Sequence, residues 1–500
     1  MSAPSNQKAS GAASGAEDQA AVQQKEKPRA AFTTGSTMRH VLVMTATSSI
    51  GLVSIFLVDA INLFYIALLG QQELAAAIGY AATIMFFSIS ICIGISIASA
   101  ALVGRALGAG EDERARELST LSLVYLLIST TLLAAALYPS LDTLLGWLGA
   151  EGETQALAVD FMQIVVPSIP LLGLGMCLGA LLRAKGDPRR AMFVTLSGGA
   201  AAIVLDPILI FGLGLELTGA AIATVLVRVV LVIVGLWGVH TVHRMLGPVS
   251  KKTAVSALRP FFAIALPAVV TQLATPVGNA YVTAAIAEFG DDAVAGWAIV
   301  GRLLPVAFGV IFALSGSVGP IVSQNYGAKL FGRVRSTMRD ALTFTLIYCL
   351  VIWAILAALS STLVSIFGAT GDAATLVTVF CWLVAGSFLF NGALFVANAG
   401  FNNLGHPVYA TVFNWGRATL GVVPFVWVGK AYGPEGVLIG WGLGAIVFGI
   451  GSAIVAFHVI AKLSDADGTD GHTGEPMPKP LPGSAAAASP FSSGKTVSLD

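Results

Sequence analysis

Long apolar segments dominate the sequence and limit what it can fold into. Twelve can be counted, and each reaches the roughly 20 residues that a helix needs to cross the hydrocarbon core of a bilayer. Only 11% of the residues are charged, whereas soluble domains carry about 25%. Lipid admits only helices and closed barrels, and these segments are far too long for barrel strands. The sequence therefore predicts an all-α integral membrane protein with twelve transmembrane helices, at residues 41–69, 74–104, 117–139, 155–182, 190–213, 217–242, 260–288, 293–324, 338–361, 373–402, 408–429 and 435–461.

Lysine and arginine gather in alternate connections between the predicted helices. They occur in the N-terminal tail and after the second, fourth, sixth and eighth helices. The connections after the first, third, fifth, seventh and ninth helices have none, and the one after the eleventh has only Lys430. By the positive-inside rule we expect a multi-pass protein of the plasma membrane (the bacterial inner membrane) with both termini in the cytoplasm. The net charge of zero argues against a nucleic-acid partner. No feature indicates a dimer, so we expect a monomer.

The second half of the chain repeats the first. LGQQELAAAIGYA at 69–81 resembles FGDDAVAGWAIVG at 289–301, and LVGRALGAGEDERAR at 102–116 resembles IVSQNYGAKLFGRVR at 321–335. Six helices per repeat is an even number, so we expect two six-helix bundles of equal orientation, related by a pseudo-two-fold axis along the membrane normal. The predicted units are a disordered cytoplasmic tail (1–38), an N-terminal bundle (39–244), a cytoplasmic linker (245–258), a C-terminal bundle (259–462) and a second disordered tail (463–500).

Four polar residues of the first half lie at similar depth in the predicted helices. Asp59 lies roughly 16 Å and Asp206 roughly 12 Å from the outer end of its helix, with Thr224 roughly 10 Å in; Asn62 follows Asp59 by one turn. An ionised carboxylate at this depth is costly, so two neighbouring carboxyls could hold one proton or a cation and release it when water enters. The competing interpretations are that Asp59 fills a packing defect or pairs with an arginine, and that Asp206 satisfies backbone groups freed by Pro207.

Other intramembrane polar and aromatic residues carry weaker predictions. Arg228 and Arg417 are expected to be interior and structural, whereas Arg302 could be structural or functional. Five residues are candidates for the substrate cleft, with ordinary helix packing as the competing interpretation. They are Met85, Phe86, Gln163, Gln272 and Asn279.

The ordered set of motifs in residues 40–460 resembles the multidrug and toxic compound extrusion (MATE) transporters. The resemblance is carried by LVDAINLFYIALLGQQELAAAI, GRALGAGEDERAR, LRAKGDP, LDPILIFGLGLELTGAAIAT and FGDDAVAGWAIVGR. It implies antiport, in which organic cations or other amphiphilic drugs leave the cell while H⁺ or Na⁺ enters. The chain further resembles the prokaryotic branch named after the DNA-damage-inducible protein F, whose cation chemistry would fall here on Asp59, Asp206 and Thr224.

Two departures from that branch affect the expected mechanism. The family usually has an asparagine four residues before the aspartate of the LDP motif, where this chain has Ala202. Losing that amide oxygen weakens a Na⁺ site and favours H⁺ as the coupling ion. The family also tends to have a proline in its first helix, but residues 40–70 contain none. Bending of the first helix as the coupling step is therefore in doubt.

Three other functions were weighed against H⁺-coupled export. Na⁺-coupled antiport keeps the same site. A flippase for lipid-linked saccharides would need a cationic cavity for a diphosphate, and the acids Asp59 and Asp206 have the wrong sign. A membrane-embedded enzyme is not expected, because the helices contain no HExxH, no GxSxG and no His/Cys cluster. No cofactor or metal is expected, and the four cysteines are predicted to be reduced packing residues.

Overall fold

The computed structural model describes residues 30–68 and 72–467, and all regular structure in these ranges is helical. The prediction of an all-helical membrane fold is confirmed. The first half of the chain, residues 37–242, is called the N-half below. Its elements are α2 (Thr37–Leu68), α3 (Gln72–Gly108), α4 (Asp112–Leu137), η1 (Tyr138–Ser140), α5 (Leu141–Trp147), α6 (Gly152–Val165), η2 (Val166–Ser168), α7 (Ile169–Lys185), α8 (Pro188–Pro207), η3 (Ile208–Gly212), α9 (Glu216–Leu236) and η4 (Trp237–Val242).

The second half, residues 251–466, is called the C-half and repeats this order. Its elements are α10 (Lys251–Ala287), α11 (Asp291–Gly327), α12 (Phe331–Ala358), α13 (Ser360–Ile366), α14 (Gly371–Trp382), η5 (Val384–Ser387), α15 (Phe388–Leu404), α16 (Pro407–Gly416), η6 (Arg417–Gly421), α17 (Val423–Gly429), η7 (Lys430–Tyr432) and α18 (Gly433–Ala466).

Several predicted membrane crossings are divided into two helical pieces. By length and composition, eleven of the described helices could cross a membrane. The count is eleven and not twelve because Pro407–Ala466, which contains two of the predicted crossings, is counted as one continuous span. Within it, Gly433 takes a left-handed φ of +84°, a conformation that glycine adopts without steric cost, and α18 packs back against α17. This segment is therefore a hairpin of two crossings.

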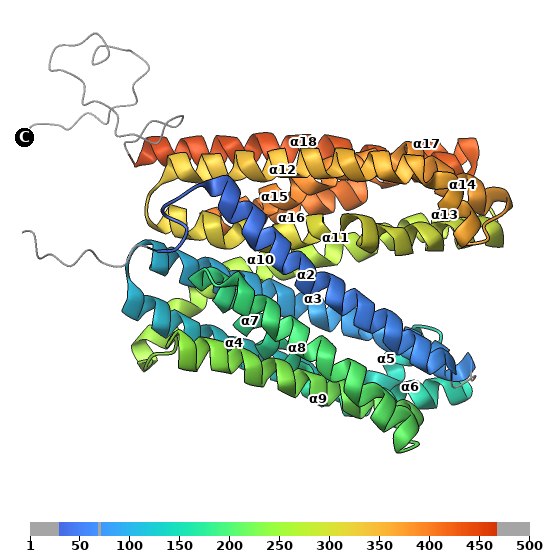
Figure 1. Cartoon of the computed structure of the whole chain (residues 1–500), viewed down its shortest axis with the longest axis horizontal. Helices are drawn as coiled ribbons and strands as arrows, with labels where there is room; N and C mark the ends of the chain where they lie inside the picture. The colour runs from blue at the N-terminus through green and yellow to red at the C-terminus, as the bar shows by residue number, and fades with distance from the viewer. Residues whose placement is uncertain (1–29, 69–71, 468–500) are drawn as a thin grey trace, which may run out of the picture.

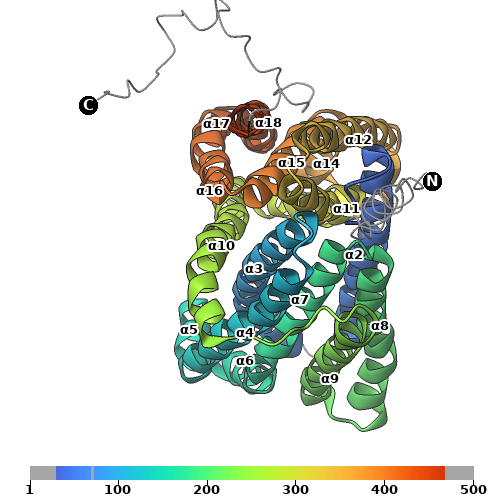
Figure 2. The ribbon, with the colours of Figure 1, turned by 90° about the vertical axis from the view of Figure 1, so that its left-hand side faces the viewer.

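The two halves are arranged with pseudo-two-fold symmetry. In the N-half, α2 packs against α8 of its own half and against α11 of the other. In the C-half, the corresponding helix α10 packs against α16 of its own half and against α3 of the other. Figure 1 shows α2 running diagonally from the upper group of helices to the lower one, and Figure 2 shows α2 and α10 on opposite sides of the molecule.

The halves meet most closely where α3 crosses α11. A methyl group added at Gly108 would overlap the carbonyl oxygen of Gln324, and one added at Gly327 would overlap that of Arg105. In the sequence repeat, Gly108 corresponds to Gly327 and Arg105 to Gln324, so the two contacts are equivalent. The pseudo-two-fold axis therefore passes through this crossing, where only glycine lets the backbones approach so closely.

Polar contacts reinforce the crossing. Arg105 donates from Nε to the carbonyl of Asn403 at 3.0 Å and from Nη2 to that of Asn402 at 3.2 Å, and its guanidinium lies 5.3 Å from the ring centre of Tyr326. Gln324, fully buried on α11, donates to the carbonyl of Ala184 in the N-half at 2.7 Å. These bonds tie α3 and α7 of the N-half to α11 and α15 of the C-half.

The segment just before α2 is folded between the halves. The backbone N–H of Phe32 donates to Gln324 Oε1 at 2.8 Å, and the Phe32 ring is buried. Arg333 donates to the carbonyls of Phe32, Thr34 and Gly35 at 2.9 to 3.2 Å. Residues 30–36 thus lie within the predicted tail 1–38 and yet have defined structure, because these backbone groups find partners on α11 and α12. The predicted linker 245–258 also differs, since α10 begins inside it at Lys251.

The LRAKGDP motif forms the turn between α7 and α8. Gly186 ends α7 with a φ of +95°, and Asp187 caps α8 by accepting a hydrogen bond from the backbone N–H of Arg190 at 3.0 Å. Partial burial acts to raise the pKa of Asp187. The stronger combined effect of hydrogen bonds from Arg190 and from His243, at 2.9 Å, lowers it. The motif is therefore explained by a left-handed C-cap followed by an N-cap.

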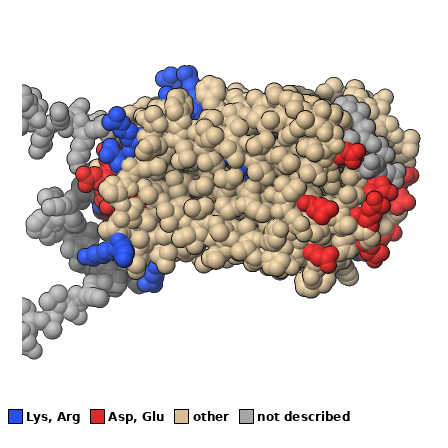
Figure 3. Space-filling view, turned by 90° about the horizontal axis from the view of Figure 1, so that it is seen from below, with Lys and Arg blue, Asp and Glu red and all other residues tan. Residues whose placement is uncertain are grey.

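Charge separates the two ends of the molecule. Figure 3 shows Lys and Arg at one end and most of the visible Asp and Glu at the other; these are called the basic end and the acidic end below. Among the described residues, each hydrogen bond between the halves lies in the basic half of the molecule. The one farthest from the basic end joins Ser317 to Ser48 at 3.1 Å. The described hydrogen bonds between the halves thus gather toward the basic end.

The α3–α11 crossing makes a direct stability prediction. Gly327→Ala should lower the free energy of unfolding by about 1–3 kcal/mol, because the added methyl overlaps backbone that cannot move aside. Gly316→Ala, on the same helix, is the matched control, because a methyl there meets open space; it should be neutral or stabilising by up to about 1 kcal/mol. Thermal unfolding of the purified protein in detergent measures both. Equal melting temperatures for the two variants would contradict the close backbone approach of α3 and α11.

Candidate coupling site

Asp206 is a buried acid at a distortion in its helix. It lies near the end of α8, is only 3% exposed, and precedes Pro207 and the π-helical segment η3. No described residue donates a hydrogen bond to its carboxyl group. The interpretation that Asp206 satisfies backbone groups near Pro207 thus has no hydrogen bond to support it in the described part of the chain. A buried carboxyl without a partner is held more cheaply in its protonated form.

The neighbouring helix α2 carries Asp59 and Asn62, whose side chains lie outside the described residues. Their backbones belong to α2, which packs along α8. A Cβ built on Gly51 would lie 3.5 Å from Thr195, and the Tyr65 and Phe211 rings are 5.9 Å apart. These contacts put Asp206 level with the turn of α2 that contains Asn62, with Asp59 about one turn closer to the basic end.

Thr224 of α9 lies at the same depth as Asp206, on the side of α8 opposite α2. A Cβ built on Gly219 would lie 2.6 Å from the carbonyl oxygen of Leu209, so α9 runs closely against η3. The hydroxyl of Thr224 is half-buried and donates to the carbonyl of Ala220 at 2.9 Å. It can still accept a hydrogen bond, because a hydroxyl has two lone pairs.

Arg228, one turn from Thr224 on α9, does not neutralise Asp206. It is buried, and its Nη1 donates to the carbonyl of Val165 at 3.0 Å and to Ser168 Oγ at 2.6 Å. Both acceptors flank the break between α6 and α7 at η2. Arg228 therefore fastens α9 to that break, in line with the structural role expected of it.

The two arginines predicted to lie within the membrane in the C-half have different surroundings. Arg302 is exposed well inside α11 and makes no hydrogen bond or ion pair with another described residue. Because a charge within a membrane span faces the bundle interior or a water-filled cavity, we expect its side chain to face the space between the halves. Arg417 is buried, and among the described residues it bonds only to Thr275, at 3.2 Å.

The residues proposed for the substrate cleft are spread over both halves. Met85 is buried in the N-half core, Phe86 and Gln163 are exposed, and Gln272 and Asn279 are half-buried on α10. None of the five lines either of two crevices on the described part of the molecule. Their role stays a prediction.

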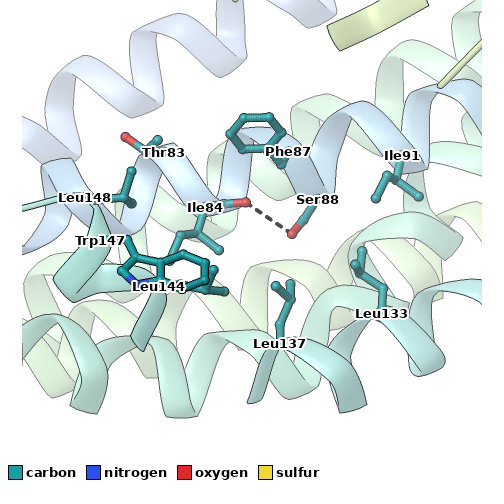
Figure 4. Close-up of a pocket in the computed structure, with 10 residues that line it drawn as sticks. All are labelled: Thr83, Ile84, Phe87, Ser88, Ile91, Leu133, Leu137, Leu144, Trp147 and Leu148. Atoms are coloured by element: carbon teal, nitrogen blue, oxygen red, sulfur yellow. Dashed lines mark hydrogen bonds between the residues drawn. The ribbon is translucent and has the colours of Figure 1, made fainter. Parts of the chain in front are cut away.

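The first crevice is almost entirely apolar. It has a volume of about 270 Å³ and lies between α3 and the α4–α5 segment, as Figure 4 shows. Its two hydroxyls are used within α3: Thr83 donates to Gly79, and Ser88 to Ile84. A ligand pocket needs a few placed polar groups, so this crevice fits lipid tails better than a drug.

The polar residues that join the halves were not among the candidates predicted from the sequence. Gln324, Asn325, Arg333 and Arg105 lie in the repeated motifs after the second and eighth predicted helices. The repeat was the available signal, because it aligns Arg105 with Gln324 and, three residues further on, Gly108 with Gly327, the glycines at which the halves meet. Within the described residues, no group of three or more His, Cys, Asp or Glu side chains could hold a metal ion.

Comparison with known proteins identifies the family. The MatE family model matches the chain twice, at residues 46–208 and 267–428. This chain belongs to the MatE family. Its members are transporters and not enzymes, so the expectation that the chain is no enzyme is confirmed. The resemblance to MATE transporters seen in the sequence is confirmed as well, but the branch named after DNA-damage-inducible protein F is not specifically supported.

Curated relatives and solved structures agree with this assignment. A FAD transporter of Shewanella oneidensis is 27% identical over 86% of this chain and 97% of its own length. The multidrug export protein MepA of Staphylococcus haemolyticus is 25% identical over 82% of this chain and 91% of its own. The structure of a mutant of the Vibrio cholerae MATE transporter VcmN matches with a TM-score of 0.81 and 26% identity, covering 86% of this chain and 97% of that one.

The geometry of Arg228 generates a stability prediction. Arg228→Met should lower the free energy of unfolding by about 1–3 kcal/mol, because the Val165 carbonyl and the Ser168 hydroxyl lose a buried donor. Arg302→Met is the matched control, since Arg302 is exposed and bonds to no described residue. Thermal unfolding in detergent should show a lower melting temperature for the first variant alone. Equal losses would mean that Arg228 does not fasten α9 to the α6–α7 break.

Proposed function

We propose that this MatE-family protein is an H⁺-coupled efflux antiporter that exports amphiphilic compounds by alternating access. The observation that carries the proposal is the buried carboxyl of Asp206, which has no partner among the described residues and lies level with Thr224 and with the α2 turn that bears Asn62. A carboxyl in this setting gains a proton when sealed from water and loses it when water enters. Asp59 is proposed as the second acid of this site, and it is the residue that the family resemblance favours most.

The choice of H⁺ over Na⁺ rests on one missing oxygen ligand. A sodium ion in a protein needs several oxygen ligands around it. Asp59, Asn62, Asp206 and Thr224 carry oxygen atoms, but Ala202, one turn before Asp206, is buried and supplies none from its side chain where the family usually has an asparagine. A proton needs only the carboxyl. Placement in the branch named after DNA-damage-inducible protein F belongs to the same proposal.

The contacts between the halves support an alternating-access cycle. We take the basic end as cytoplasmic by the positive-inside rule, in the plasma membrane, with the chain acting as a monomer. The described state is then closed toward the cytoplasm by the α3–α11 crossing and by residues 30–36. Opening the other way requires these contacts to separate, which rigid rocking of the two halves about the site would accomplish.

The relatives give two classes of cargo. MepA is named a multidrug export protein and the Shewanella protein a FAD transporter. We propose amphiphilic drugs as the first class and flavin nucleotides as the second, because the FAD transporter matches the chain over nearly its whole length. A lipid-linked saccharide flippase is the less favoured alternative, since Asp206 is an acid where a diphosphate would need cations.

Transport in proteoliposomes tests the coupling ion. A pH gradient that favours H⁺ movement against the drug should drive ethidium across the membrane, and a Na⁺ gradient at equal pH on both sides should not. Protein-free liposomes and liposomes given an ionophore are the controls. Transport driven by a Na⁺ gradient alone would mean that Na⁺, and not H⁺, is the coupling ion at this site.

Substitution of the acids tests the site itself. Asp206→Asn and Asp59→Asn should each abolish H⁺-driven ethidium transport, because an amide cannot exchange the proton. Asp160→Asn is the matched control: Asp160 is exposed on α6 near the acidic end, and its loss should leave transport intact. Expression and melting temperature are measured alongside. Wild-type transport by Asp206→Asn would remove Asp206 from the mechanism.

A further inference from the structure

A polar stripe runs along α10 in the C-half. Its members recur at the three- and four-residue spacing of one helix face, and all are half-buried or exposed. They are Gln272, Thr275, Asn279 and Thr283, called the α10 stripe below. A second exposed face of α10 is apolar and carries Leu266, Val270 and Val277.

These two faces have different surroundings. The apolar face suits lipid tails. Polar side chains on a lipid-facing surface would be costly, so the α10 stripe faces the space between helices. Its outer end confirms this direction, because Trp297 of α11 donates from Nε1 to Thr283 Oγ1 at 2.9 Å.

Arg417, on the neighbouring segment η6, contacts the α10 stripe at Thr275. It is the first residue of the π-helical segment η6, and α10 packs closely there, since a Cβ built on Gly278 would lie 3.3 Å from Ala418. Nη2 donates to Thr275 Oγ1 at 3.2 Å, which is the guanidinium's only hydrogen bond to a described residue. Nε is buried with no partner. No described carboxylate forms an ion pair with Arg417.

Arg417 has fewer partners than Arg228, the other arginine that is buried among the described residues. Arg228 bonds to two acceptors, and Arg105 to two carbonyls. A guanidinium presents five N–H donors in a fixed fork that matches a carboxylate or a phosphate. A buried cation left with one neutral partner is expensive, and π-helical segments often mark functional sites.

We propose that Arg417 and the α10 stripe form a binding site for the anionic group of the exported molecule, a phosphate or a carboxylate. The site deepens the proposed export function and rests on it. The anion comes from the cargo and not from a lipid headgroup, because Arg417 lies ten residues into its crossing, about 15 Å from the basic end of that helix. The cargo class is therefore an amphiphile with an aromatic or apolar body and a negative group.

Two flavins that differ only in a phosphate test the site. Equilibrium dialysis measures binding of riboflavin and of flavin mononucleotide to the purified full-length protein in phosphatidylcholine nanodiscs. The wild type should bind the phosphorylated flavin more tightly. Arg417→Gln should weaken that binding about 10- to 100-fold, the loss expected for a charge-assisted hydrogen bond, and should leave riboflavin binding unchanged. Arg417→Lys should recover part of the difference.

Arg228→Gln is the matched control for losing a buried arginine, and it should keep the preference for the phosphorylated flavin. Melting temperatures confirm that each variant is folded. If the wild type does not prefer flavin mononucleotide over riboflavin, including the case in which neither binds, the proposal is overturned. It is also overturned if Arg417→Gln keeps the preference. Binding needs no ion gradient, so this result is independent of whether H⁺ drives transport.

Discussion

The close crossing of α3 and α11 is the contact on which the arrangement of the two halves depends. Gly108 and Gly327 let each helix meet the carbonyl of the other at equivalent positions of the repeat. The pseudo-two-fold axis relates the two contacts to each other. Losing one of them alone would therefore break the symmetry of the crossing. Around them, Arg105, Gln324 and Arg333 bond to backbone carbonyls and not to carboxylates. Hydrogen bonds to carbonyls depend on geometry. They stabilise the described conformation without a strong ion pair that would resist separation of the two halves.

The two halves of the repeat carry different buried charges. Asp206 lies just before the π-helical segment η3 in the N-half, and Arg417 begins the π-helical segment η6 in the C-half. The two residues are not repeat partners, because Asp206 corresponds to Val423 and Asp59 to Asn279. Each of the two charges therefore lies beside a π-helical segment, but at a different position of the repeat. An acid that exchanges protons in one bundle and a cation that receives an anion in the other can act on a single cargo without neutralising each other.

The sequence predicted much of the fold because membrane proteins leave few alternatives. Apolar length and lysine–arginine asymmetry gave the crossings, and the repeat gave two bundles. The helix breaks at η2 and η5 and the folded segment at 30–36 were not predictable, because they depend on tertiary partners such as Arg228 for Val165 and Arg333 for Phe32. For the site, hydropathy singled out Asp206 as a costly residue. It could not reveal that Arg228, one turn from Thr224, is already bonded elsewhere.

That last point bears on the proton exchange proposed for Asp206. An arginine within reach of a carboxyl would fix it as an ion and remove it from proton exchange. Here Val165 and Ser168 hold the guanidinium of Arg228 at the α6–α7 break, and no described cation takes its place beside Asp206. In the proposed mechanism, the break in one crossing thus holds an arginine that could otherwise compete for the acid of another. In this interpretation the proline-containing η2 is part of the coupling site, although it contributes no group that binds the proton.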